Sequence, residues 1–182
     1  MSACPTLETE RLILRPFRGS DIDRYFAILD TTEVRAALRV SDSFNRDGTW
    51  SNMAMWLGQW ALRNSGRWAV ELKSTGELIG RAGSHRPERE GWPGLEIGWT
   101  FDPAHWGNGY ATEAGRASIE WAFANHAADE LVSCILVGNL RSQAVAERLG
   151  FRLREQKTMS IYPAKPHGIW VLPRNRSASG DR

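Results

Sequence analysis

The segment best suited to chemistry joins a strand, through a turn, to a helix, and it reads Trp106-Gly107-Asn108-Gly109-Tyr110-Ala111-Thr112. Glycines allow a backbone to curl so that successive N–H groups point into one concavity. The first turn of the helix adds about half a positive charge at the same place. Together these features favour the binding of a pyrophosphate, although a tight turn that merely starts a helix has the same Gly-x-Gly spacing.

A candidate general base lies shortly before this segment. Glu96 is the one carboxylate in the apolar segment Leu95–Phe101. Desolvation in such a strand raises the pKa of a carboxyl group and makes it a better proton acceptor, directly or through a water molecule. The alternative is a solvated or ion-paired residue on the other face of the strand. His85, at the end of the preceding strand, competes for the role because an imidazole titrates near neutral pH.

The elements that must position these residues follow from the spacing of apolar side chains. Alternation and short apolar runs predict strands at Arg11–Arg15, Trp68–Leu72, Leu78–Gly83, Leu95–Phe101 and Leu131–Val137, with one or two more in Arg152–Ser160 and Gly168–Leu172. Helical spacing predicts helices from the Ser20-Asp21 cap to Leu29, at Trp50–Asn64, at Tyr110–Phe123 and at Ser142–Leu149. This order predicts a mixed α/β domain around one central sheet.

Length and composition indicate an ordinary globular chain. Its 182 residues are 42% hydrophobic and 24% charged, which is enough apolar material for a real core. No apolar run approaches the ~20 residues of a membrane helix, and the N-terminus lacks the pattern of a secretory signal. We therefore expect one domain over residues 1–174, a disordered polar tail over residues 175–182, and a cytoplasmic location.

Charge and cysteine content exclude several classes of partner. The net charge is +2 and the arginines are scattered, so neither a nucleic acid nor a membrane surface is expected. Cys4 and Cys134 are too few for a disulfide framework or a four-ligand zinc site, and no metal is expected. Cys134 lies inside an apolar run that disfavours a thiolate, so we expect no cysteine nucleophile.

The glycine-bearing segment resembles the acyl-CoA-binding loop of the GCN5-related N-acetyltransferases (the GNAT superfamily), whose pattern is Gln/Arg-x-x-Gly-x-Gly/Ala. Gly109 and Ala111 fill the two small positions, and Trp106 replaces the leading Gln or Arg. That replacement resembles the RimJ/RimL-like branch of ribosomal-protein N-terminal acetyltransferases. Other segments similar to this branch occur in order: Thr9–Pro16, Leu95–Trp99 with Asp102-Pro103, Asn139–Ser142 and Leu149–Phe151. The resemblance covers about Leu7 to Leu172.

The resemblance implies a fold and an activity. The fold would be a GNAT fold, with a central, mostly antiparallel sheet, a splayed pair of parallel strands and about four helices. The activity would be transfer of an acetyl group from acetyl-CoA to a primary amine by direct attack in a ternary complex. The acceptor could be a protein N-terminus, an amino acid or a small amine. A non-catalytic acyl-CoA-binding sensor or scaffold is the alternative.

The resemblance also implies which residues bind the cosubstrate. The splayed strands would be Glu96–Phe101 and Leu131–Val137. The residues expected to contact acetyl-CoA are Trp99, Thr100 and Phe101 along its arm, Trp106, Gly107, Asn108, Gly109, Tyr110, Ala111 and Thr112 at its pyrophosphate, and Asn139 and Ser142 just past the second strand. A turn or cap role is the alternative for Asn139.

The proton donor to the departing thiolate is less well defined. Many GNAT enzymes carry a Tyr seven residues after the Asn, and this chain has Ala146 there. Ser142, three residues after the Asn, matches a Ser of the RimJ/RimL-like branch and could hydrogen-bond the sulfur. Its alternative role is to cap the helix that starts at that point. We therefore expect Glu96 and Ser142 to be the catalytic residues, with His85 as the competing base.

The acceptor side of this fold would be rich in tryptophan. Trp50 and Trp60 are predicted on the buried face of their helix. Trp56 or Trp92 could line an aromatic pocket that attracts a cationic amine by cation–π interaction. The partners expected are acetyl-CoA and an amine; the identity of the amine and the oligomeric state, including a homodimer, stay open.

Overall fold

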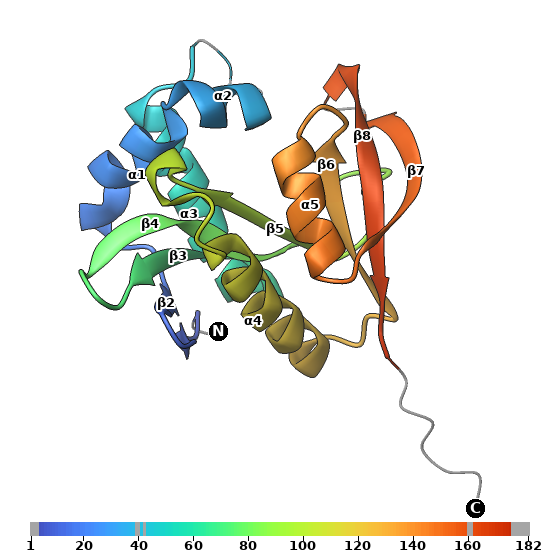
Figure 1. The fold of residues 1–182 in the computed structure, drawn as a ribbon, viewed down its shortest axis with the longest axis horizontal. Helices are drawn as coiled ribbons and strands as arrows, with labels where there is room; N and C mark the ends of the chain where they lie inside the picture. The colour runs from blue at the N-terminus through green and yellow to red at the C-terminus, as the bar shows by residue number, and fades with distance from the viewer. Residues whose placement is uncertain (1–3, 39–40, 42, 160–161, 176–182) are drawn as a thin grey trace, which may run out of the picture.

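The computed structural model describes residues 4–38, 41, 43–159 and 162–175. Its strands form one sheet of eight, in the order β1-β2-β3-β4-β5-β6-β8-β7 (Figure 1). The strands are β1 (Leu7–Glu8), β2 (Leu12–Arg15), β3 (Arg67–Leu72), β4 (Glu77–His85), β5 (Glu96–Phe101), β6 (Glu130–Leu136), β7 (Arg152–Met159) and β8 (Tyr162–Pro173). The helices are α1 (Ile22–Leu29), α2 (Thr32–Leu38), α3 (Arg46–Arg63), α4 (Tyr110–Asn125) and α5 (Leu140–Arg148), with short 3-10 turns at Gly19–Asp21 and Pro103–His105.

The predicted mixed α/β fold is confirmed. Neighbouring strands are antiparallel except for β5 and β6, which are parallel. Helix α2 was not predicted, and it brings the helices of the described residues to five instead of about four. This helix has only seven residues and buries only Val34, so its apolar pattern is too short to identify a helix from the sequence.

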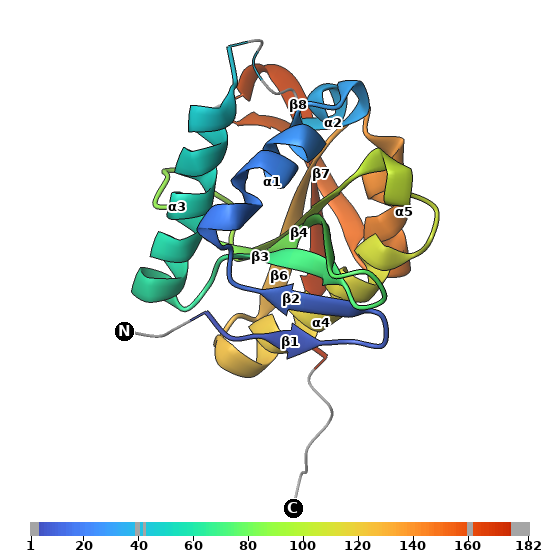
Figure 2. The same cartoon turned by 90° about the vertical axis from the view of Figure 1, so that its left-hand side faces the viewer.

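Helices cover both faces of the sheet. Successive side chains of a strand point to opposite faces, so neighbouring residues of one strand pack against different helices. On β3, Trp68 and Val70 pack into a core cluster with residues of α4, whereas Ala69 packs into a second cluster with residues of α1 and α3. Figure 2 shows α1 and α3 lying together along one side of the strands. None of the helices in the described part of the chain is long and apolar enough to cross a membrane.

The parallel pair opens after its first residues, as predicted. Glu96 and Val132 are the paired positions between β5 and β6, and the Val132 amide donates to the Leu95 carbonyl at 3.0 Å. On its other side β5 stays paired with β4 as far as Phe101, and β6 is paired with β8 along its length. The inner edges of β5 and β6 beyond Glu96 therefore face a gap.

Several predicted details are wrong at the helix ends. The predicted start of α1 is confirmed in position, because Asp21 is its N-cap residue, but the Asp21 side chain makes no hydrogen bond to α1. It is buried, accepts from the Arg18 amide at 2.7 Å in the preceding 3-10 turn, and pairs with Arg15 at 2.7 Å. Helix α3 begins earlier than predicted, at Arg46, because the side chain of Asn45 accepts from the Gly48 amide at 3.1 Å.

The tryptophans of α3 also differ from the prediction. Trp50 is 57% exposed instead of buried, while Trp56 and Trp60 are 6% and 1% exposed. The buried stripe of α3 therefore passes through Trp56, which the spacing did not favour. Residues 176–182, which hold most of the predicted tail, lie outside the described residues.

Candidate active site

The glycine-bearing turn lies between β5 and α4, as the sequence indicated, and follows the short 3-10 turn at Pro103–His105. Gly107 and Gly109 have φ angles of 83° and 82°, in the left-handed region that favours glycine. Among the described residues, none accepts a hydrogen bond from the backbone amides of residues 107–111. Gly109 is the N-cap of α4 and carries no side chain that could occupy the helix N-terminus. The turn therefore offers consecutive free donors at the positive end of a helix, which suits an anion.

A charged clamp holds this turn against the start of β2. The carboxylate of Glu113, in the first turn of α4, accepts from Thr9 Oγ1 at 2.6 Å, from the Arg11 amide at 2.9 Å and from Arg11 Nε at 2.7 Å. Arg11 Nη1 also donates to the Asn108 carbonyl at 3.0 Å, and its guanidinium lies 4.7 Å from the centre of the Tyr110 ring. Burial alone would raise the pKa of Glu113, but the hydrogen bonds from Thr9 and Arg11 outweigh it and lower that pKa. Thr9 and Arg11 thus have a physical role in positioning the turn.

Trp106 serves as a packing residue next to the turn. Its indole Nε1 donates to the Phe101 carbonyl at 2.8 Å, and Arg141 lies over its ring at 4.6 Å. The side chain also packs against buried residues of both core clusters described above. A Gln or Arg at this position would be polar; the indole instead joins the end of β5 to the core.

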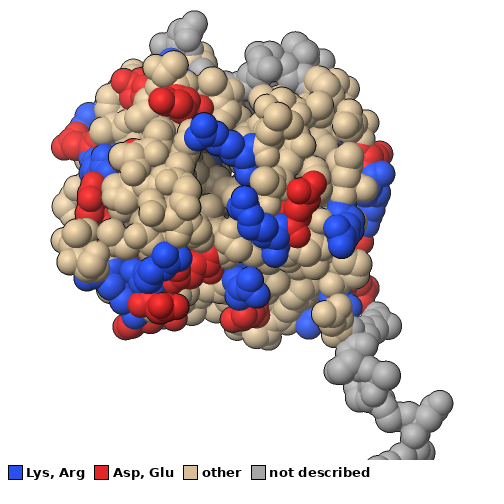
Figure 3. Space-filling view, viewed as in Figure 1, with Lys and Arg blue, Asp and Glu red and all other residues tan. Residues whose placement is uncertain are grey.

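A cavity of about 380 Å³ lies beside the open end of the strand pair. Figure 3 shows this face hollowed near its centre, with Lys and Arg side chains beside the hollow. Helices α1 to α3 form one wall, β4 and β5 cross it, and β6 and α5 form the other wall. Four of the residues expected to be catalytic or to contact acetyl-CoA line the cavity together: Glu96, Trp99, Asn139 and Ser142. His85, the competing base, lines it as well. Thr100, Phe101 and residues 106–112 are not among its lining residues, so the turn and the cavity are separate regions.

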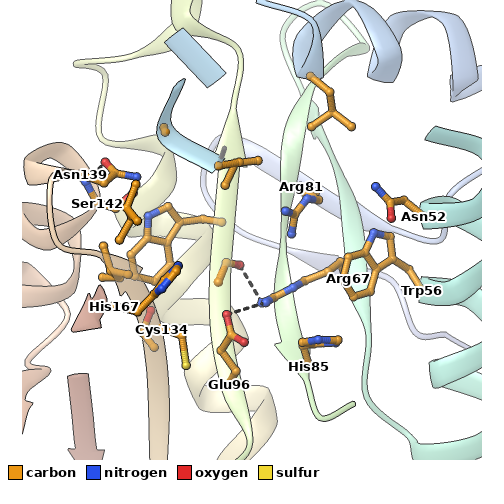
Figure 4. A pocket seen from close by; sticks show the side chains of 18 of the residues that line it. Asn52, Trp56, Arg67, Arg81, His85, Glu96, Cys134, Asn139, Ser142 and His167 are labelled. Atoms are coloured by element: carbon orange, nitrogen blue, oxygen red, sulfur yellow. Dashed lines mark hydrogen bonds and ion pairs between the residues drawn. The ribbon is translucent and has the colours of Figure 1, made fainter. Parts of the chain in front are cut away.

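Glu96 is buried, and it is paired with an arginine that the sequence did not reveal (Figure 4). Arg67 extends from β3 past β4, and its Nη2 contacts Glu96 Oε1 at 3.2 Å. Its Nη1 donates to the carbonyl of Gly98 at 3.0 Å and also to that of Gly83. Burial raises the pKa of Glu96 above its ordinary value, and the nearby Arg67 and Arg81 only partly oppose this effect. Glu96 is therefore ion-paired, as the alternative interpretation held, and its pKa is also raised, as the interpretation as a general base required.

His85 lies opposite Glu96 across the β4–β5 pair. Its Nδ1 is 3.1 Å from Gln59 Oε1. Burial, followed by the positive charges of Arg67, Arg81 and Arg89, lowers the pKa of His85 to about 2. An imidazole in this environment stays neutral at physiological pH and is a weak base.

Asn139 and Ser142 meet at the start of α5. The side chain of Asn139 is the N-cap of α5 and accepts from the Ser142 amide at 3.1 Å. The cap role given as the alternative for Asn139 is therefore confirmed, and the cap role given as the alternative for Ser142 is wrong. Both residues line the cavity. Ala146, one turn further on, is fully buried in the core between α4, α5 and β6.

The structure places further residues in the cavity that sequence reasoning missed or left open. Arg67 and Arg81 were not singled out, whereas Trp56 and Trp92 were named as alternatives and both line the cavity. The guanidinium groups of Arg67 and Arg81 lie 5.6 Å and 5.3 Å from the ring of Trp56. Cys134 is a free thiol in the cavity wall, and burial raises its pKa far above the ordinary value, which disfavours the thiolate.

Comparisons with known proteins agree with this geometry. A family model described as an acetyltransferase (GNAT) domain matches residues 11–152. The crystal structure of an acetyltransferase from Agrobacterium tumefaciens str. C58 is 32% identical, with a TM-score of 0.80, and the match covers 94% of this chain and 96% of that chain. YkkB, an uncharacterized protein of Bacillus subtilis (strain 168), is 29% identical over 92% of this chain and 99% of its own length. YoaA, an uncharacterized N-acetyltransferase of the same organism, is 27% identical over 81% of this chain and 83% of its own.

The chain belongs to the acetyltransferase (GNAT) family. It is an N-acetyltransferase, and the resemblance noted in the sequence is confirmed at the level of the family.

Proposed function

We propose that this enzyme transfers an acetyl group from acetyl-CoA to a primary amine by direct attack within a ternary complex. The observation that carries the proposal is the unpaired edge of β5 beyond Glu96, which lies in the chain between the cavity-lining Glu96 and the free amides of residues 107–111. A pyrophosphate at those amides directs the arm of the cosubstrate along the edge of β5 at Trp99–Phe101. The thioester then reaches the cavity near Asn139 and Ser142. No metal is part of the proposal.

The amine must lose a proton before it can attack, because an ammonium has no lone pair. Glu96 is the proposed base. Only Oε1 of its carboxylate is engaged by Arg67, and Oε2 accepts no hydrogen bond from any described residue. The raised pKa of Glu96 strengthens it as a proton acceptor, and Arg67 fixes its orientation.

Two further groups serve the reacting thioester. A backbone N–H on the open edge of β5 stabilises the carbonyl oxygen as it gains charge, an effect worth ~3–4 kcal/mol in other acyl transfers. The hydroxyl of Ser142 is the proposed hydrogen-bond donor to the departing sulfur; it lines the cavity and its own amide is already held by Asn139.

We also propose the RimJ/RimL-like branch as the relevant part of the family. Support comes from Trp106, from Ser142 and from the segment Thr9–Pro16. In the structure, Thr9 and Arg11 of this segment hold Glu113 at the proposed pyrophosphate turn. The branch does not fix the acceptor.

The test combines acetyl-CoA binding, measured by calorimetry, with thiol release in the presence of a panel of amines. Gly109→Asp places a side chain and a negative charge at the proposed pyrophosphate site, and we expect it to abolish binding. Gly76→Asp is the matched control, because Gly76 also has a positive φ (72°) and open space around it, in the β3–β4 turn. Normal affinity in Gly109→Asp would refute the assignment of the turn. Binding by the wild-type protein without thiol release from any amine would instead indicate a non-catalytic module.

A further inference from the structure

The cavity beside the proposed thioester site carries more positive than negative charge. Arg67, Arg81 and Arg89 line it, and Glu96 is the only acidic residue among its described lining residues. The low pKa of His85, to which these three arginines contribute after burial, reflects the same excess of positive charge. An ammonium entering here would meet net repulsion, so the charge of the cavity favours an anionic group.

Unused hydrogen-bond donors gather in the same place. The Nε groups of Arg67 and Arg81 and the indole nitrogens of Trp56 and Trp92 are buried and have no acceptor at hydrogen-bond distance among the described residues. The hydroxyl of the buried Tyr25 is the neighbouring polar group of Trp56 and Arg81. Arg67 and Trp56 are only 3% and 6% exposed. Buried donors are normally paired, and leaving one unpaired is costly. All four groups are hydrogen-bond donors, so they favour a ligand that is rich in acceptor atoms.

Arg81 is the cation best placed to receive such a partner. Arg67 is already engaged by Glu96 and by two backbone carbonyls. Arg81 lies next to it on β4 (Figure 4), and it has no carboxylate partner within the described part of the chain. Its guanidinium can therefore form the paired hydrogen bonds that a carboxylate accepts.

The aromatic surface is not free to hold an ammonium. The guanidinium groups of Arg67 and Arg81 already lie over the ring of Trp56. The guanidinium of Arg89 lies 6.0 Å from the centre of the Trp92 ring. Trp56 and Trp92 do line the cavity, but the role expected from the sequence, a cation–π site for the acceptor amine, is filled by the protein's own arginines. These rings instead present their N–H groups.

We propose that the acceptor is a small amine that also carries a carboxylate, such as an amino acid, with the carboxylate bound by Arg81 and the indole N–H groups and the amine facing Glu96. The inference rests on the proposed function and names its substrate class. A cavity of about 380 Å³ is of the size that takes small molecules. Leu29, Leu38, Phe44 and Met55 form its apolar part, which would receive an apolar side chain.

The experiment compares matched pairs of compounds that differ in the carboxylate. L-phenylalanine is paired with phenethylamine and with L-phenylalaninamide, and L-methionine with 3-(methylthio)propylamine. Short β- and γ-amino acids are paired with the amines that lack their carboxylate. Equilibrium binding to the protein with coenzyme A present tests the carboxylate site, and thiol release from acetyl-CoA tests the transfer. The two readouts separate failure of the inference from failure of the proposed function.

The diagnostic variant is Arg81→Gln, which removes the charge and keeps a polar, though shorter, side chain. We expect it to weaken binding of the carboxylate-bearing member of a pair by roughly tenfold or more, on the scale of one hydrogen bond to a charged group, and to leave the other member unchanged. Arg154→Gln is the control, because Arg154 lies on β7 and pairs with Glu130 away from the cavity. Folding of both variants is checked by thermal unfolding.

Each outcome decides the inference. Preferential binding of amino acids that Arg81→Gln abolishes would support it, even if no acetyl group is transferred. Equal or tighter binding of the amines without a carboxylate would overturn it, as would an unchanged preference in Arg81→Gln. Absence of binding by every amino acid at millimolar concentration, or a preference for peptide N-termini with no carboxylate nearby, would overturn it as well.

Discussion

Glu96 has a structural role beside its proposed catalytic one, because it pairs with the buried Arg67. Arg67 is 3% exposed and satisfies part of its charge with Glu96 and part with carbonyls of β4 and β5. Removing either partner would leave a buried charge uncompensated, which is strongly destabilising. Glu96→Gln keeps an oxygen that can accept a hydrogen bond from Arg67 but leaves the charge of Arg67 uncompensated, so the folding of this variant is checked by thermal unfolding before its kinetics are compared.

We predict that Glu96→Gln lowers kcat by at least ~100-fold, the lower end of what general base catalysis contributes, while acetyl-CoA affinity stays nearly intact. In the wild-type enzyme the active form of Glu96 is the carboxylate. Because its pKa is raised by burial, kcat/KM should fall on acidification already above the ordinary carboxyl pKa of 4.5, and this acid limb should vanish in Glu96→Gln. Steady-state kinetics over a pH series measures both effects.

Glu155→Gln is the control, because Glu155 is exposed on β7 and pairs with Lys157. Unchanged kcat in Glu96→Gln would remove Glu96 from the mechanism. Loss of the acid limb in His85→Gln, with the limb retained in Glu96→Gln, would transfer the role of base to His85.

Single residues also explain why the site could be predicted only in part. The turn at Gly107–Gly109 and the carboxylate of Glu96 belong to short local segments, so their types and spacing are visible in the sequence. Arg67 reaches the site by crossing β4 to β5, a contact that depends on strand register. The one sign of this contact in the sequence is the glycine at position 98, where a Cβ would lie 2.6 Å from Arg67 Nη2. A glycine inside a strand signals a close approach without revealing what approaches.

Among the elements, α4 depends on β2 for the position of its first turn. Glu113 receives three hydrogen bonds from Thr9 and Arg11, and Arg11 in turn holds the Asn108 carbonyl. The clamp thereby connects residues about a hundred positions apart at the proposed pyrophosphate site.

We predict that Glu113→Gln lowers the free energy of unfolding by about 1–3 kcal/mol, because hydrogen bonds to a charged, partly buried acceptor are weakened. Acetyl-CoA affinity should fall as well, since Arg11 no longer fixes the turn. Urea unfolding and calorimetry provide the measurements. Asp23→Asn, in the exposed pair with Arg46, should change neither property. Wild-type stability in Glu113→Gln would show that the clamp is not a structural requirement.

The prediction of elements succeeded where an apolar pattern was long and failed where tertiary contacts override it. The strands of the central sheet were found because their alternating or continuous apolar residues match the burial of β2 to β6. Helix α2 was missed, and Trp50 was placed on the wrong face of α3. Several faces of that helix carry apolar residues, so spacing alone did not identify the buried one.

For the whole molecule, the sheet is interrupted at the β5–β6 pair. One group of strands, β1 to β5, and another, β6 to β8, are joined in the sheet through the pairing of Glu96 with Val132. The single domain over residues 1–174 and the cytoplasmic location stay predictions.

We predict that coenzyme A slows hydrogen exchange of the amides at residues 107–111 and along the open edge of β5, because an amide that donates a hydrogen bond exchanges more slowly. The outer strand β7 should be unaffected. Exchange followed by mass spectrometry, with and without coenzyme A, measures this. Protection that spared residues 107–111 would contradict the proposed path of the cosubstrate.

The interruption has a consequence for how the opening keeps its width. With backbone pairing at one end only, the spacing between the two groups of strands depends on the core layer that packs against them. Ala122 of α4 and Ala146 of α5 are fully buried in this layer, in the same core cluster as Ile97 of β5 and Ile135 of β6. Because both side chains are single methyl groups, α4 and α5 can pack closely against the strands at these positions. We expect larger side chains at these two positions to push the two groups of strands apart and so to alter the opening, because neither alanine is among the residues that line the cavity.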